Sequence, residues 1–328
     1  MLRMLLPVSL VSHLAFAAAT PTPAPTPAST PAPGAATASA PGPAATPKKP
    51  TSTAELVAIS KPSDWRKPEQ KNLLYFEIAQ GKVIIELSPE YAPKHVERIR
   101  ALAKEKYWDG LAITRSQDNY VVQWGDPNAE KPRLVKKAKA VTGKLPPELE
   151  IDTPKKIAFR ELPDRDVYTD FVGMTNGMAA GRDKEQKKTW LLHCYGVLGV
   201  GRGMETDSGD GTELYVVIGH APRHLDRNVA IVGRVLQGME HLASLPRGHG
   251  PLGFYDTEKG EKPVTIKSIH LGSELPSEER LNLEVLRTDT ELFSQLIEVR
   301  RTLPNAWFVF KTGHADACNY AVPVREVK

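Results

Sequence analysis

Short apolar runs rich in β-branched and aromatic residues recur from residue 73 to residue 271. Only two stretches between them have apolar residues at helical spacing. A sheet of many short strands leaves unpaired backbone groups at its two edges unless it closes on itself. The pattern therefore predicts a mainly β protein with a closed sheet. The predicted strands are 73–78, 83–87, 112–115, 120–123, 197–200, 214–218, 229–235 and 264–271, and the predicted helices are 89–106 and 237–245.

Two segments lack this pattern. Residues 127–194 contain a basic stretch at 131–144 and only mixed, weak periodicity, which predicts no clear element. Residues 276–328 form a C-terminal extension, with an apolar segment at 307–310 near its end. The extension contains a predicted helix, which is marked by Leu292, Leu296, Ile297 and Val299. The sequence leaves the roles of both segments open.

The first residues predict export. Arg3 precedes an apolar run over 4–16, and small residues follow it. This order is typical of a secretory signal peptide, which we assign to residues 1–19, with a mature chain that begins at Ala18 or Thr20. An uncleaved anchor is the alternative, but the run is short for a hydrocarbon layer of about 30 Å. We therefore expect an exported protein, periplasmic or secreted, that does not span a membrane.

Proline is concentrated in one segment, because ten of the chain's 28 prolines lie in residues 21–50. A chain that alternates Pro with Ala and Thr has little bulky apolar surface, so burial cannot offset the entropy lost on ordering. We predict that residues 20–52 are a disordered, extended linker. The folded part then begins between Ser52 and Asn72.

Charge, cysteine content and motifs exclude several classes. The net charge of +4 is too small to indicate nucleic-acid binding, and two cysteines rule out multi-cysteine metal frameworks. Neither an H-E-x-x-H nor a G-x-S-x-G motif is present, so we expect no metal and no cofactor. Gly199, Gly201 and Gly203 suggest a dinucleotide loop, but Met204 stands where its third glycine belongs. We interpret these glycines as a turn with unusual backbone angles.

Cys194 and Cys318 allow two alternatives. An oxidising compartment favours a disulfide between them. Cys194 also follows Leu191 and Leu192 in an apolar run, which fits a buried free thiol. A bridge needs Cα atoms within about 7 Å, which the sequence does not define. Both alternatives therefore stay open.

Residues 113–126 read Ile-Thr-Arg-Ser-Gln-Asp-Asn-Tyr-Val-Val-Gln-Trp-Gly-Asp. In this run Arg115, Tyr120 and Gln123 stand at the spacing of a strand and its Gln-Gly-Gly-Asp-like end in the cyclophilin family of peptidyl-prolyl isomerases. Other segments match the family in the same order, at 83–87, 92–96, 212–215 and 224–226. The chain therefore resembles the cyclophilins over roughly residues 72–275.

The resemblance implies an eight-stranded antiparallel barrel capped by two helices. We place this barrel at residues 70–275, with the insertion within 127–194 and the extension at 276–328. The implied activity is isomerisation of X-Pro bonds in proline-containing peptides or unfolded protein clients. We expect a monomer that does not bind nucleic acid.

The resemblance also implies the site residues. Arg115 would donate to the prolyl nitrogen of the twisted amide, because its guanidinium is a charged, rigid donor fork. A surface arginine in a salt bridge is the alternative. Gln123 would hold a substrate carbonyl or orient Arg115. The implied substrate-binding positions are Tyr120, Val121, Gly201, Arg202, Glu213, Tyr215, His224 and Leu225, of which Val121 also fits a place in the barrel core.

Strand geometry adds a condition. Side chains alternate faces along a strand, so Tyr120 and Gln123 would lie on opposite faces of a regular strand. We therefore expect a bend or bulge that brings both to one groove.

The Phe-His that precedes the arginine in the family is replaced by Ile113-Thr114, and three further departures concern the expected site. Glu213 replaces a Gln and would lie close to Arg115, either pairing with it or competing with the substrate for it. His224 replaces a Trp associated with cyclosporin binding, so we expect weak binding of such cyclic peptides. Val229 replaces a His that often contacts substrate.

These departures keep other functions open beside a working isomerase. The first is a chaperone module that binds proline segments with little or no turnover. The second is a cell-envelope structural protein that reaches its partner through the Pro-rich arm.

Overall fold

The computed structural model describes residues 49–154 and 156–327. The predicted signal peptide and most of the predicted linker lie outside the described residues. Eight strands form a closed barrel in the order β11-β12-β5-β4-β14-β2-β3-β13, and every neighbouring pair is antiparallel. The strands are β2 (Leu73–Ile78), β3 (Gly81–Leu87), β4 (Ala112–Ser116), β5 (Val121–Gly125), β11 (Val197–Val200), β12 (Leu214–Val217), β13 (Ile231–Gln237) and β14 (Val264–Leu271). The predicted fold class is confirmed.

Two helices cap the barrel, as expected. Helix α2 (Pro93–Lys104) begins with a proline, whose fixed φ suits the first helical position. Its apolar face, with Val96 and Ile99, belongs to the same buried core as the barrel interior. Helix α3 (Met239–Ala243) contributes Leu242 to this core. The predicted helix over 89–106 is shorter in the structure, because residues 88–92 form a turn before the proline.

The insertion folds into a second, five-stranded antiparallel sheet. Its order is β6-β10-β9-β8-β7. The strands are β6 (Ile151–Asp152), β7 (Arg160–Glu161), β8 (Phe171–Thr175), β9 (Met178–Asp183) and β10 (Lys188–Leu191). A Cβ at Gly173 would lie 2.4 Å from the Phe159 ring, and one at Gly181 would lie 2.6 Å from the Trp190 ring. These glycines make room for aromatic rings, and they also weaken the strand signal in the sequence.

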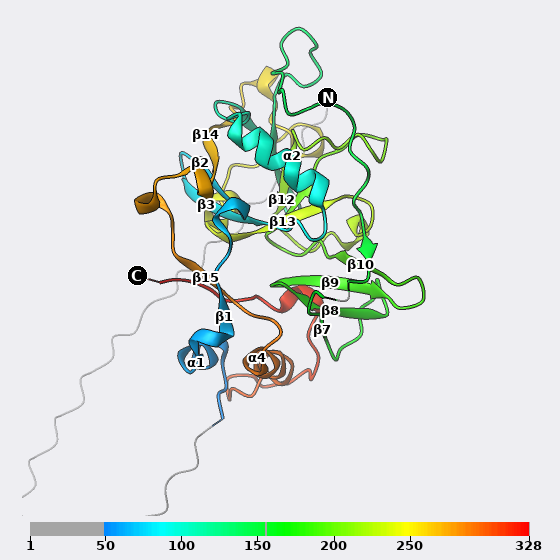
Figure 1. Ribbon diagram of the computed structural model, residues 1–328, viewed down its shortest axis with the longest axis vertical. Helices are drawn as coiled ribbons and strands as arrows, with labels where there is room; N and C mark the ends of the chain where they lie inside the picture. Colours follow the sequence, from blue (N-terminus) through cyan, green and yellow to red (C-terminus); the bar gives the residue numbers. More distant parts are fainter. Residues whose placement is uncertain (1–48, 155, 328) are drawn as a thin grey trace, which may run out of the picture. The chain divides into compact units, whose positions relative to one another are not determined.

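The C-terminal extension folds together with residues that precede the barrel. Strands β1 (Trp65–Arg66), β15 (Leu283–Leu286) and β16 (Val324–Glu326) form a three-stranded sheet in the order β1-β15-β16. Helix α1 (Thr53–Ala58) packs against α4 (Glu291–Thr302), which is the helix predicted in the extension (Figure 1). The remaining helical segments are short 3₁₀ turns, η1 (Pro62–Asp64), η2 (Gln70–Asn72), η3 (Arg223–Leu225), η4 (Pro251–Gly253), η5 (Thr257–Lys259), η6 (Gly272–Glu274), η7 (Ser277–Glu279) and η8 (Ala317–Asn319).

A second hydrophobic core joins these parts. Leu56 from α1, Val172 from β8 and Phe293 from α4 are buried together with Val197 and Ile231 on the outer face of the barrel. The insertion, the extension and the residues before the barrel thus form one layer against β11 and β13. Within the described residues, no helix combines the length and apolar character needed to cross a membrane.

The glycines at 199–203 are not a turn with unusual backbone angles, so this interpretation was wrong. Gly199 lies within β11, and none of the three glycines has a positive φ. A Cβ at Gly199 would lie 2.3 Å from the Tyr215 ring, and one at Gly201 would lie 3.0 Å from Cβ of Glu213. Glycine is needed here because neighbouring side chains cross the backbone closely.

Cys194 and Cys318 form a disulfide, with Cα atoms 5.1 Å apart. The bridge links the end of the insertion to η8 in the C-terminal extension, and the two cysteines are 124 residues apart in the chain. Of the two alternatives left open by the sequence, the structure has the bridge.

We expect the double substitution Cys194→Ser and Cys318→Ser to lower the free energy of unfolding by about 3–5 kcal/mol, because a long closed loop restricts the unfolded chain. Urea denaturation measures this, and reductant should lower the unfolding midpoint of the unsubstituted protein to the same value. An unchanged midpoint in the double variant would contradict the expectation.

Candidate functional site

A groove of about 900 Å³ is lined by residues of β4, β5, β11 and β12 together with residues of neighbouring loops. It collects residues that are far apart in the sequence. Nine of the ten predicted site residues line it, namely Arg115, Tyr120, Val121, Gln123, Gly201, Arg202, Glu213, Tyr215 and Leu225. The tenth, His224, lies beside the groove, where its ring is parallel to that of Tyr120 at a centroid distance of 6.1 Å.

Strand β5 divides its side chains between the barrel and the groove. Val122 and Trp124 belong to the barrel core, whereas Val121 and Gln123 line the groove. Tyr120 precedes the strand, in a turn where its N–H donates to the Gln117 carbonyl, so strict alternation does not apply to it. The irregularity itself lies in β4, where the register shifts just before Arg115 and sets Arg115 opposite Gln123.

Arg115 is half-buried at the groove and held by three acceptors. Its Nε donates to the Leu252 carbonyl at 2.6 Å and Nη1 donates to Oε1 of Gln123 at 3.2 Å. Nη2 donates to Oε1 of Gln117. Burial lowers the pKa of Arg115, but an arginine stays protonated in proteins. No ion pair within the described residues includes Arg115, so its charge is not neutralised by a carboxylate.

Two aromatic rings flank this guanidinium. Its central carbon lies 5.4 Å from the centroid of the Tyr120 ring and 5.5 Å from that of Phe254. Rings at such distances attract a cation through their quadrupole. The guanidinium is therefore confined by both hydrogen bonds and ring contacts.

Glu213 contacts Gln123 rather than Arg115. Its Oε2 accepts a hydrogen bond from Nε2 of Gln123 at 2.9 Å. The expected direct pairing of Glu213 with Arg115 is therefore wrong, because Gln123 lies between the two side chains. The carboxylate fixes the amide so that its oxygen faces Arg115.

The Glu213 carboxyl has a raised pKa. Burial is the largest cause, and nearby Asp210, Glu130 and Asp126 add to it, while the hydrogen bond from Gln123 acts in the opposite direction. A negative charge at this position is therefore costly in the folded protein.

The apolar wall of the groove is a small cluster outside the barrel. Val121, Tyr215 and Val217 are buried together, with Tyr120 and Val229 packed against them. Val121 is 2% exposed and belongs to this wall, not to the barrel core. The cluster provides methyl groups and a ring face suited to an apolar ring of a ligand.

Two loops that line the groove carry no functional signal in the sequence. The first holds η4, in which Leu252 has a φ of 56° and presents its carbonyl to Arg115. Its glycines and proline indicate a turn, but nothing in the sequence connects them to Arg115. The second is part of the insertion, and its residues that line the groove are Ala129, Glu130, Val135, Lys136, Lys137, Ala138 and Val141.

Metal ligands do not cluster in the part of the chain that the structure describes. No group of three His, Cys, Asp or Glu side chains there is arranged so that it could hold a metal ion.

We expect Glu213→Gln to stabilise the protein at pH 7 and to have little effect near pH 4. A raised pKa means that the folded state binds this proton more tightly than the unfolded state, so the folded state gains stability as pH falls through it. The substitution removes a carboxylate that is costly only when charged. Urea denaturation at the two pH values measures this, with the exposed Glu90→Gln as control. An equal effect of Glu213→Gln at both pH values would contradict it.

Comparisons with known proteins agree with this geometry. Residues 73–271 match the family described as cyclophilin type peptidyl-prolyl cis-trans isomerase/CLD. The structure is similar to the crystal structure of cyclophilin AquaCyp293 from Hirschia baltica, with a TM-score of 0.62 and 26% identity, over 76% of this chain and 91% of that one. Peptidyl-prolyl cis-trans isomerase ppi1 of Schizosaccharomyces pombe is 47% identical over 47 residues, and a probable peptidyl-prolyl cis-trans isomerase of Brucella suis is 34% identical over 58 residues.

These two matches cover 14% and 18% of this chain, and each covers 30% of the relative. The family match, in contrast, spans more than half of the chain and all eight barrel strands. The chain belongs to the cyclophilin-type peptidyl-prolyl cis-trans isomerase family.

Proposed function

We propose that the protein is a peptidyl-prolyl cis-trans isomerase that acts on X-Pro bonds of peptides or unfolded exported proteins. The observation that carries this proposal is the Arg115 guanidinium, which lines an apolar-walled groove and has no carboxylate partner among residues 49–154 and 156–327. A guanidinium has five N–H groups, and the three hydrogen bonds to protein acceptors leave two for a ligand.

The chemistry needs only such a donor. Amide resonance imposes a barrier of about 18–20 kcal/mol on rotation of the peptide bond. In the twisted amide the prolyl nitrogen becomes pyramidal and gains a lone pair that can accept a hydrogen bond. Donation from Arg115 to this lone pair favours the twisted form over both planar forms, which accelerates rotation in either direction.

Gln123 and Glu213 contribute by orienting the Arg115 guanidinium. Glu213 accepts from the Gln123 amide, and the Gln123 oxygen accepts from Arg115. This chain of hydrogen bonds holds the guanidinium in the groove that Val121 and Tyr215 also line. A proline ring against that wall would be stabilised by about 0.8 kcal/mol for each buried methylene.

A binding module without turnover is the second candidate. It is favoured by the three protein acceptors that already engage Arg115, since they reduce its freedom to follow the moving nitrogen. The two candidates differ in one measurement, the rate at which a short X-Pro peptide reaches its cis-trans equilibrium.

We expect Arg115→Ala to lower kcat/KM by about 10²-fold or more, equivalent to about 2.7 kcal/mol of transition-state stabilisation. Peptide affinity should change less, because planar ground states have a poorer acceptor at nitrogen than the twisted amide has. Isomerisation of a proline-containing peptide and its binding isotherm measure the two effects.

Arg280→Ala is the matched control, because Arg280 of the C-terminal extension is exposed, donates to the backbone carbonyls of Ser273 and Leu275 and does not line the groove. Its activity should equal that of the unsubstituted protein. If the unsubstituted protein binds unfolded chains but does not accelerate isomerisation, the binding module replaces the enzyme.

We further propose that the protein is exported to the periplasm or secreted. The first residues of the sequence support this, and a disulfide is typical of oxidising compartments. Expression with the full N-terminal sequence should yield an exported form that begins at Ala18 or Thr20, as intact-mass measurement determines. Exported protein that retains Met1 would contradict the cleavage.

A further inference from the structure

We propose that His193, which lies behind the groove, positions the Tyr215 ring as the wall against which the proline ring packs. This inference rests on the proposed function for the identity of the ligand. His193 lies after β10 at the end of the insertion, and its side chain is fully buried. It is therefore a positioning residue that would not touch the ligand.

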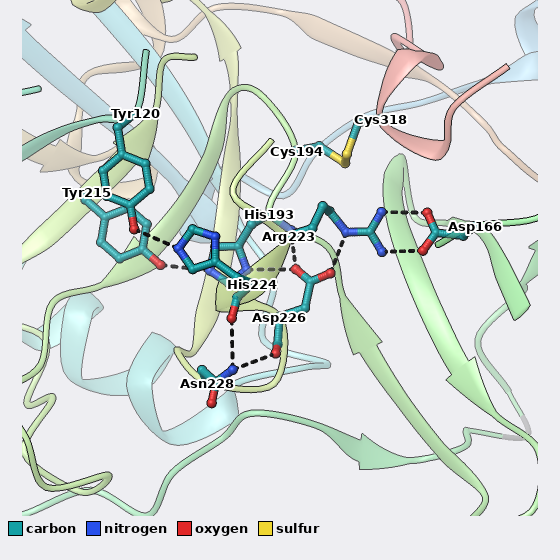
Figure 2. Close-up of polar contacts among 10 residues, drawn as sticks. All are labelled: Tyr120, Asp166, His193, Cys194, Tyr215, Arg223, His224, Asp226, Asn228 and Cys318. Carbon is teal, nitrogen blue, oxygen red and sulfur yellow. Dashed lines mark hydrogen bonds and ion pairs between the residues drawn. A yellow bond between two sulfur atoms is a disulfide. The ribbon is translucent and has the colours of Figure 1, made fainter. Parts of the chain in front are cut away.

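The contact that carries the proposal joins Nε2 of His193 to Oη of Tyr215 at 2.8 Å (Figure 2). On the other side of the imidazole, Nδ1 lies 3.0 Å from Oδ1 of Asp226. The His193 backbone N–H donates to the same carboxylate oxygen at 2.8 Å. The imidazole thus spans the distance between a carboxylate and the phenol of the groove wall.

The chemistry of these groups sets the direction of each hydrogen bond. A carboxylate only accepts, so Nδ1 of His193 carries the proton and donates to Asp226. Nε2 of the neutral ring is then an acceptor, to which the Tyr215 hydroxyl donates. Burial lowers the pKa of His193 and raises the pKa of Tyr215, which keeps both rings in these neutral forms.

Asp226 is held in place by Arg223, which in turn pairs with Asp166 of the insertion. Nε of Arg223 donates to Oδ2 of Asp226 at 2.5 Å. The other end of the guanidinium forms a two-pronged pair with Asp166, at 2.7 and 2.9 Å. The Arg223 and Asp166 side chains are 4% and 2% exposed, so the pair is shielded from water. Asp166 and His193 both belong to the insertion, which therefore reaches the groove wall through charged and polar contacts.

The space available to Tyr215 is equally restricted. Gly199 lies opposite Tyr215 in the β11–β12 register, and a Cβ there would be 2.3 Å from both Cζ and Oη of the phenol. The ring can lie flat over β11 only because residue 199 has no side chain. The hydrogen bond from the hydroxyl to His193 then selects one position of the ring on that surface.

The test uses two substitutions that distinguish the role of Nδ1 of His193 from that of Nε2. The amide of Gln reaches the place of Nε2 and can accept from Tyr215, whereas the amide of Asn reaches only the place of Nδ1. We expect His193→Asn to raise KM for a short X-Pro peptide about tenfold, with a smaller change in kcat. His193→Gln should stay within twofold of the unsubstituted protein. Tyr215→Phe, which removes only the hydroxyl, should raise KM as much as His193→Asn does.

Combination of the substitutions decides between positioning and general destabilisation. In the Tyr215→Phe background, His193→Asn and His193→Gln should differ by less than twofold, because the contact is already absent. A tenfold loss from His193→Asn in that background would overturn the proposal, and so would an unchanged KM in Tyr215→Phe. The KM of Tyr215→Phe tests the proposal even if His193→Asn does not fold.

His95→Asn is the matched control, because His95 is another buried histidine paired with a carboxylate, at 2.6 Å from Glu148 and away from the groove. It should lower stability without changing KM. The dissociation constant of the same peptide is measured for every variant. If the protein binds the peptide without isomerising it, the proposed activity fails, and the pattern of dissociation constants still tests the role of His193.

Discussion

Closure of the eight-stranded sheet is the constraint on which the rest of this structure depends. Because every strand pairs on both sides, its backbone is satisfied within the barrel, and its side chains are divided between an apolar interior and an outer face. Val122 and Trp124 of β5 fill the interior, which leaves Val121 and Gln123 for the groove. The groove is therefore built on rigid strands, and the register of β4 against β5 sets Arg115 opposite Gln123.

The segments outside the barrel pack against a different part of its outer surface, on β11 and β13. The insertion, the C-terminal extension and the residues before β2 bury one common apolar core against β11 and β13, and the disulfide joins two of these parts. The buried Arg223 of η3 pairs with Asp226 beside it and with Asp166 of the insertion. Desolvation makes such a network a weak source of net stability, but loss of one member costs about 3–5 kcal/mol. The network instead holds Asp226 in place, and Asp226 contacts His193 behind the groove.

Two groups of opposite charge lie in the groove, the Arg115 guanidinium and the Glu213 carboxyl, and the Gln123 amide lies between them. Arg115 is positive and has no carboxylate partner among the described residues, whereas burial, and after it the nearby acids, raise the pKa of Glu213. Gln123 accepts a hydrogen bond from Arg115 through its amide oxygen and donates one to Glu213 through its amide nitrogen. The amide keeps the two charges apart, so the guanidinium retains N–H groups for a ligand while its orientation is still controlled by the carboxylate.

Local patterns in the sequence determined the barrel strands, the two capping helices and the helix of the extension, because alternation and helical spacing follow directly from which side chains are buried. The sheet of the insertion escaped this reasoning, since Gly173 and Gly181 serve distant aromatic rings and not the strand itself. The motifs that match the cyclophilin family in order along the chain predicted ten site residues, and nine of them line the groove. Only the tertiary structure decided that Glu213 binds Gln123, that Leu252 supplies an acceptor for Arg115 and that His193 contacts Tyr215. Those contacts join residues 22 to 137 positions apart, and a hydrogen bond depends on distances of a few ångströms that no pattern along the chain contains.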